Sequence, residues 1–260
     1  MPANKFKPLK RNPFGKVAGV EGFFTPNYTY RVKSTCPGNL IAYWPLSETT
    51  GFTIQDETGN GRTGSYNNVT LEQIGIGDGR TGVGTLGLTS GLGNLYSTSF
   101  RDAFNPREGT ISVWFRVVNL AAWGDNQDRR VFTIGNSGSN SIFFFKNGSV
   151  SSSLQARYVA NNTINTWSIG TTSSSIGWEH FAITFSRSAS EVVYYYQGIS
   201  RETDTSMGDF VGALNDATAF LFRGTASNAT GNIWSGSACH MAVWTTPLTA
   251  NQVRDLSRIY

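Results

Sequence analysis

Short apolar or alternating runs follow one another along most of this chain and leave few folds open to it. Each run has the length of a strand, is rich in aromatic or β-branched residues, and ends in a turn rich in Gly, Asn, Ser or Asp. The runs cover residues 40–46, 84–88, 110–118, 130–135, 141–146, 153–159, 180–186, 191–198, 217–223 and 238–244. Many strands at this spacing, with almost no helix, predict an all-β fold, an antiparallel two-sheet sandwich of the jelly-roll type.

Composition agrees with a β-rich protein. The 260 residues are 15% charged and include 29 Gly, against about 25% charged residues and about 7% Gly in an average soluble protein. One short helix is predicted at the C-terminus, where Thr249 and Gln252 form a capping box before the apolar pair Val253 and Leu256. Asn147-Gly148 predicts a tight hairpin turn between two of the strands.

The first part of the chain differs from the rest in charge. Residues 1–33 hold seven of the 21 Lys and Arg but one of the 17 Asp and Glu, a net charge of +6 in a chain of net charge +4. Four prolines in the same stretch prevent a long helix or strand. We therefore expect an extended arm over residues 1–36 and a single jelly-roll domain over residues 37–260.

Six aromatic rings alternate with the cations of this arm, and a solvated tail would gain nothing from exposing them. We predict that the arm docks on a partner chain. The expected docking residues are Lys5, Phe6, Lys7, Lys10, Arg11, Phe14, Lys16, Phe23, Phe24, Tyr28 and Tyr30. One alternative is that the arm packs on its own domain. Binding to nucleic acid is a less favoured alternative, because six net charges over this length are few.

No run of 18 apolar residues occurs, and the N-terminus lacks the apolar core of a secretory signal peptide. We therefore expect no membrane partner and a protein that stays in the cytoplasm until release. The two cysteines, Cys36 and Cys239, are too few for a disulfide scaffold and are expected to be ordinary thiols.

Four blocks along the chain resemble one family in order and spacing. LIAYWPLSETTGFTIQDETGNGRTGSY, TISVWFRV, GWEHFAITFSRSASEVVYYYQG and HMAVWTTPLTANQVRDL are similar to segments of the concanavalin A-like, laminin G-like jelly rolls. The resemblance covers residues 39–256. It implies two face-to-face antiparallel sheets, paired first and last strands, and core positions for Trp44, Trp114 and Trp178.

The resemblance also implies three kinds of site. Asp56 and Asn60 match a turn that lies near calcium in many relatives. Residues 88–100 lack the acidic cluster that would supply further ligands, so an ordinary turn is the favoured alternative.

Relatives that are lectins stack a sugar on an exposed ring, for which Trp123, Trp167 and Trp234 are the candidates; loop packing is the alternative for each. A glycoside hydrolase needs two carboxylates, and the ExDxxE pattern of the laminarinase-like relatives is absent. We expect no cofactor and a structural His180.

A jelly roll with few charges, no secretion signal and an anchoring extension looks like a phage virion component. The favoured function is therefore a non-enzymatic capsid decoration or tail accessory protein, docked on other structural proteins through its arm with the domain facing outward from the virion. This step rests on fold-level analogy. A glycan-binding lectin is the alternative, with cell-surface glycans as partners, and a glycoside hydrolase is the third reading. The sequence is compatible with a homo-oligomer and fixes no oligomeric state.

Overall fold

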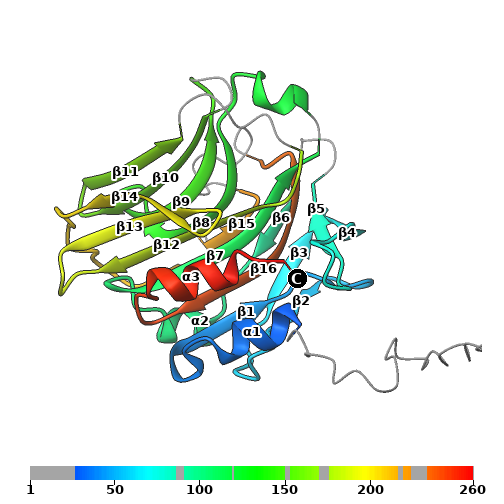
Figure 1. Cartoon of the computed structure of the whole chain (residues 1–260), viewed down its shortest axis with the longest axis horizontal. Coiled ribbons are helices and arrows are strands. Elements are labelled where there is room, and N and C mark those ends of the chain that lie inside the picture. The colour runs from blue at the N-terminus through cyan, green and yellow to red at the C-terminus, as the bar shows by residue number, and fades with distance from the viewer. Residues whose placement is uncertain are drawn as a thin grey trace, which may run out of the picture.

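The computed structural model describes residues 27–85, 91–118, 120–149, 153–169, 176–215, 219–223 and 233–259, and its strands pair into two antiparallel sheets (Figure 1). In spatial order, the first sheet contains β14 (Ile199–Asp204), β13 (Glu191–Tyr196), β12 (Glu179–Ser186), β7 (Glu108–Val117), β16 (Gly236–Trp244), β5 (Gly82–Gly84) and β4 (Thr70–Gln73), and β1 (Leu40–Trp44) also pairs with β16. The second sheet contains β11 (Thr163–Ile169), β10 (Ser153–Ala160), β9 (Asn140–Asn147), β8 (Arg129–Ser137), β15 (Ala219–Leu221), β6 (Leu92–Asn94), β3 (Gly64–Asn67) and β2 (Thr53–Ile54). The predicted two-sheet jelly-roll sandwich is confirmed.

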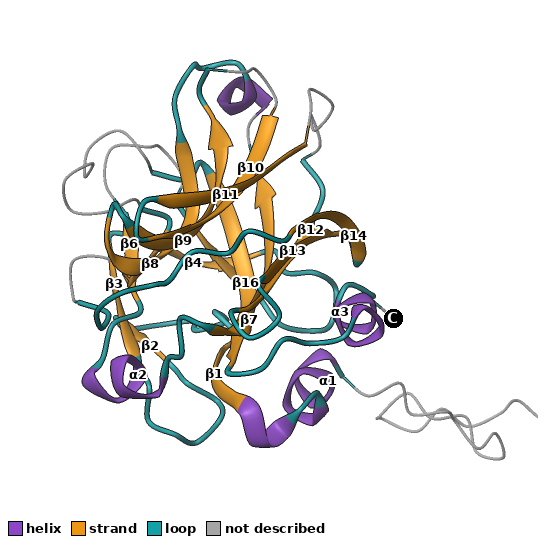
Figure 2. Cartoon of the chain, turned by 90° about the vertical axis from the view of Figure 1, so that its left-hand side faces the viewer, coloured by secondary structure: helices purple, strands orange, loops and turns teal. Residues whose placement is uncertain are grey.

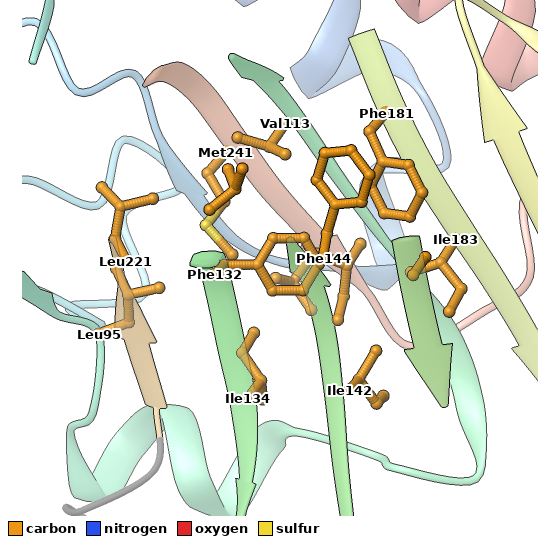
Figure 3. Packing of buried hydrophobic residues seen from close by; sticks show 14 of the residues in the cluster. Leu95, Val113, Phe132, Ile134, Ile142, Phe144, Phe181, Ile183, Leu221 and Met241 are labelled. Carbon is orange, nitrogen blue, oxygen red and sulfur yellow. The ribbon is translucent and has the colours of Figure 1, made fainter. Parts of the chain in front are cut away.

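The main core lies between the two sheets, where large apolar side chains from both inner faces meet (Figure 3). Phe144 of β9 stacks on Phe181 of β12 with ring centroids 4.0 Å apart and planes 5° apart. Phe115 of β7 meets the edge of Phe144 at 4.9 Å. Because successive residues of a strand point to opposite faces, these contacts fix which side chains of each strand are left on the outside.

A second apolar cluster covers the outer face of the first sheet. The helices α1 (Tyr28–Ser34) and α3 (Ala250–Leu256) lie side by side on this face (Figures 1 and 2). Val32 and Val253 from the two helices pack with Trp114 and Trp244 of the sheet. The indole N–H of Trp244 donates to the carbonyl of Thr35 at 2.7 Å, which fastens the end of α1 to the strand.

The C-terminal helix begins with the capping box that the sequence predicts: the Thr249 side chain accepts from the Gln252 N–H, and the Gln252 side chain accepts in return from Thr249. The shorter elements α2 (Thr98–Ala103), η1 (Pro37–Asn39) and η2 (Leu120–Trp123) were not predicted. No helix within the described residues is long and apolar enough to cross a membrane.

The prediction of an extended arm through residue 36 is wrong for residues 28–34, which form α1. Asn27 caps this helix by accepting the Tyr30 N–H, and Tyr28 and Val32, four residues apart, share its buried face. The Tyr28 hydroxyl donates to the Leu256 carbonyl at 2.9 Å, so its own domain buries it. Tyr30 stays 62% exposed. The other expected docking residues lie before residue 27, outside the described residues.

The hairpin predicted at Asn147-Gly148 joins β9 to β10, but its loop is longer than expected. Asn147 pairs with Ser153, so residues 148–152 connect the strands in place of a two-residue turn. Of the three tryptophans assigned to the core, Trp44 and Trp114 are buried, whereas Trp178 is half-buried beneath the Arg116 guanidinium. The run at 84–88 overlaps β5 by one residue, Gly84, and residues 86–88 fall outside the described ranges.

Phe144→Ala should lower the free energy of unfolding by about 3–5 kcal/mol, because it removes a fully buried ring from the contact between the sheets. Phe52 is 77% exposed, so the same substitution there should cost under about 0.5 kcal/mol. Urea denaturation of both variants measures the difference. Equal losses would contradict the placement of Phe144 at the centre of the sandwich.

Candidate ligand-binding pocket

The outer face of the second sheet carries a small apolar cluster formed by Phe143, Phe145 and Val159. Phe143 and Phe145 point outward because their neighbours Ile142 and Phe144 point into the sandwich. Phe143, the more exposed of the two rings, is nevertheless only 7% exposed. Their cover comes largely from two arginine side chains on the neighbouring strands.

The strand register places these arginines on both sides of β9. Arg130 of β8 lies opposite Phe145, and Thr133 of the same strand lies opposite Phe143. On the other side, Arg157 of β10 lies opposite Phe143. Side chains of directly opposed residues on one face are close enough to touch, so both arginines reach the rings between them.

Both guanidinium groups lie over the same two rings. The Cζ atom of Arg130 is 3.7 Å from the centroid of Phe143 and 4.9 Å from that of Phe145. For Arg157 the corresponding distances are 5.9 and 5.3 Å. Each cation–π contact of this kind contributes about 0.5–2 kcal/mol. A guanidinium group can contact a ring and still donate hydrogen bonds through its N–H groups.

A pocket of about 230 Å³ is formed between these side chains. It is lined by Arg130, Thr133, Gly138, Ser141, Phe143, Arg157, Val159 and Ile164. The lining combines two cations, two hydroxyl groups and an apolar surface, and it includes no carboxylate. Ile164 of β11 forms part of its rim and is 57% exposed.

Several polar atoms of the pocket lack partners among the described residues. The Nε atoms of Arg130 and Arg157 and the Thr133 hydroxyl are buried without a hydrogen bond there, whereas Arg157 Nη2 donates to the Gln155 side chain at 3.2 Å. Burial lowers the pKa of Arg130 to about 10; the charge of Asp128 opposes this shift, and the charge of Arg157 acts in the same direction as burial. Arg130 is therefore charged at neutral pH but incompletely solvated.

The three tryptophans predicted as sugar-stacking platforms are buried, so they cannot stack on a ligand from solvent. Trp123, Trp167 and Trp234 are 3%, 4% and 1% exposed. Trp167 stacks within the core on Phe181, and the Trp234 indole donates to a backbone carbonyl, that of Arg116. The alternative of loop and core packing holds for all three.

The turn at Asp56 and Asn60 has its polar atoms engaged within the protein. The Asp56 carboxylate accepts the backbone N–H groups of Tyr43, Thr58 and Arg62, and the Asn60 amide donates to the Ile41 carbonyl. Oxygens surrounded by N–H donors do not suit calcium, which needs their free lone pairs. Within the described ranges, no group of three or more His, Cys, Asp or Glu could hold a metal ion.

Both histidines are buried within the outer cluster of the first sheet. His180 Nε2 lies 2.8 Å from the Ser112 hydroxyl, and both side chains are at most 1% exposed, so no substrate reaches this pair. His240 Nδ1 lies 2.7 Å from the Tyr43 hydroxyl, and its Nε2 lies 3.0 Å from an oxygen of Asp78. These contacts support the expected structural role of His180 and give His240 the same role.

Residues 91–254 match the concanavalin A-like lectin/glucanases superfamily. The chain belongs to this superfamily. No curated protein matches its sequence. The expected family is thus confirmed, and a concanavalin A-like lectin or glucanase fold agrees with the two sheets described above.

Solved structures share this concanavalin A-like fold at low identity. The ligand binding domain of botulinum neurotoxin serotype D, in complex with N-acetylneuraminic acid, is 12% identical with a TM-score of 0.61 over 87% of this chain and 52% of that one. The binding domain of Paraclostridial Mosquitocidal Protein 1 is 17% identical with a TM-score of 0.59, over 85% and 52%. Trypanosoma rangeli sialidase in complex with sialic acid is 11% identical with a TM-score of 0.62, over 88% and 36%. The chain spans about half the length of these toxin domains.

Unfolding of this concanavalin A-like domain should become easier as the pH falls. Burial lowers the pKa of His180 to about 3, whereas an unfolded histidine titrates near 6.5. Between these values the unfolded chain binds a proton that the folded chain does not, so the free energy of unfolding decreases by up to about 1.4 kcal/mol per pH unit. Urea denaturation between about pH 7 and pH 4 measures this slope, which His180→Gln should reduce. An unchanged slope in that variant would contradict the burial of a neutral His180.

Proposed function

We propose that the chain is a non-enzymatic carbohydrate-binding module whose ligand site is the pocket formed by Arg130, Phe143 and Arg157. The observation that carries the proposal is a pocket on an outer sheet face whose lining combines two guanidinium groups and two hydroxyl groups with apolar side chains. A sugar ring presents an apolar C–H surface and hydroxyl groups, so it can use both parts of such a pocket. The volume of about 230 Å³ is below the roughly 300–1,000 Å³ of drug-sized sites, which suits a single sugar unit.

Two fold neighbours support this proposal, since one is a ligand binding domain in complex with N-acetylneuraminic acid and the other is a sialidase in complex with sialic acid. The sialidase raises the alternative of a glycoside hydrolase. Hydrolysis by two carboxylates needs an Asp or Glu pair about 5–9.5 Å apart across the bond to be cleaved. The lining of this pocket contains neither residue type, which favours binding over hydrolysis.

Filling the pocket tests the binding role directly. Gly138, in the turn between β8 and β9, lines the pocket, and a Cβ atom at this position meets nothing within 4 Å. Gly138→Tyr should therefore fold normally, with stability changed by under about 0.5 kcal/mol, and should lose binding on a glycan array. Gly124→Tyr is the matched control, because Gly124 has equally open space and does not line the pocket.

Glycans bound by the parent chain and by both variants alike would place the carbohydrate site elsewhere. Absence of binding by the parent chain, with and without calcium, would reject the carbohydrate-binding role.

We propose as a second role that the chain attaches to a larger assembly, such as a phage virion, with the domain facing outward. The support is the sequence of residues 1–26, which carry five of the cations counted in the arm and four of its six aromatic rings. Residues 28–34 belong to the domain, since α1 packs on α3 and the first sheet. The attachment role therefore concerns residues 1–26.

Deleting residues 1–26 should abolish incorporation into the assembly while the domain keeps its thermal stability, because Asn27 and α1 remain in place. Deleting residues 1–36 should destabilise the domain as well, since Tyr28 and Val32 are buried against it. Co-purification with particles and thermal unfolding measure the two effects. Full incorporation of the shorter deletion would reject the attachment role.

A further inference from the structure

Two cations share the pocket and no carboxylate lines it, although the charge of Asp128, outside the lining, stabilises the Arg130 cation. Their immediate neighbours differ in this respect, because Arg129 and Lys146 both pair with Asp125, the lysine at 2.7 Å. Among the described residues, neither Arg130 nor Arg157 forms an ion pair. A charge that is partly removed from water without a counter-charge is unfavourable. A bound anion would supply the missing counter-charge.

The geometry also suits an anion. The Cζ atom of Arg130 lies 3.7 Å from the centroid of Phe143 and that of Arg157 lies 5.3 Å from the centroid of Phe145, and the Nε atom of each arginine is buried without a hydrogen-bond partner in the described part of the chain. A guanidinium edge matches the two oxygens of a carboxylate or a sulfate. The Thr133 hydroxyl, also without a partner there, adds a donor on the same face.

The remaining wall of the pocket is apolar and faces the arginines from β10 and β11. Val159 and Ile164 supply it, and Ile164 remains more than half exposed at the rim. A free inorganic anion gains nothing from such a wall, whereas the carbon skeleton of a sugar does. Charge and apolar surface together point to an anionic group that is attached to an organic ring.

We infer that the pocket recognises an acidic sugar, with its carboxylate or sulfate group held between Arg130 and Arg157 and its ring against Val159 and Ile164. This inference rests on the proposed carbohydrate-binding function and names its ligand class. Charge-assisted hydrogen bonds to an arginine are about twice as strong as neutral ones. An acidic glycan should therefore bind about 10- to 100-fold more tightly than its uncharged parent.

The test uses the full chain on a glycan array that holds neutral glycans beside their sialylated, uronic-acid and sulfated forms. Titration calorimetry then compares N-acetyllactosamine, its sialylated form and its sulfated form, which separates carboxylate from sulfate on one backbone. Affinity for the acidic forms should fall as salt is added, because dissolved ions screen the attraction between the arginines and the acidic group.

Two substitutions separate charge from shape at this site. Arg157→Gln removes one positive charge and should weaken acidic ligands about 10- to 100-fold, while neutral glycans should change little. Arg157→Lys keeps the charge but lacks the planar fork, so it should restore part of the affinity. Arg201→Gln is the matched control, because Arg201 is an exposed arginine on β14 of the other sheet and also lies near an aromatic ring, that of Tyr196. Thermal unfolding of each variant reports on its folding.

The outcomes divide cleanly. Preference for sialylated, uronic or sulfated glycans that Arg157→Gln removes and Arg201→Gln leaves intact supports the inference and identifies the acid group. Equal affinity for neutral and acidic forms overturns the inference and leaves the carbohydrate-binding role standing. Binding to no glycan overturns both. Acidic binding that Arg157→Gln does not alter overturns the assignment to this pocket.

Discussion

Contact between the inner faces of the two sheets determines which side chains of the described strands face outward. Phe144 and Phe181 stack at the centre of that contact, and this pair determines which side chains of β9 and β12 point into the sandwich. Alternation along each strand then determines which residues face outward. On the first sheet the outward residues are apolar and α1 and α3 cover them. On the second sheet they include Phe143 and Phe145, which arginines cover instead.

The two outer faces therefore differ in the chemistry that they present. On the first sheet, α1 and α3 bury tryptophan and valine side chains, so solvent does not reach this face beneath the helices. His180, which lies there, is buried and stays neutral. An arginine is a different kind of cover, because it shields a ring with one surface and offers hydrogen-bond donors with its edge. The second sheet therefore buries its outward phenylalanines and still has a pocket lined by two arginines, which is the proposed ligand site.

The sequence predicted the fold well because strand alternation and capping are local properties. The runs at 141–146 and 180–186 became β9 and β12, and the capping box of α3 formed as expected. The proposed ligand site was missed because it depends on register between strands. Residues 130, 143 and 157 are far apart in the chain, and only strand pairing brings them together.

One sequence signal did point to the outer face of β9. Phe143 and Phe145 alternate with inward residues, so β9 is apolar on both faces, which is unusual for an antiparallel strand with a solvated side. The tryptophans were misjudged because a polar neighbourhood in sequence does not reveal burial in three dimensions.

A bulge in β8 shifts its register between Arg130 and Phe132. Val131 and Phe132 consequently both belong to the main core, while Arg130 and Thr133 on either side of them line the pocket. Because the bulge sets two residues of β8 opposite one residue of β9, Arg130 and Thr133 point to the same face although they are three positions apart. Removal of the extra residue would restore regular alternation and leave Arg130 and Thr133 on the outer face, but the core would lose one of two inward side chains, so the bulge adds apolar packing without moving either pocket residue.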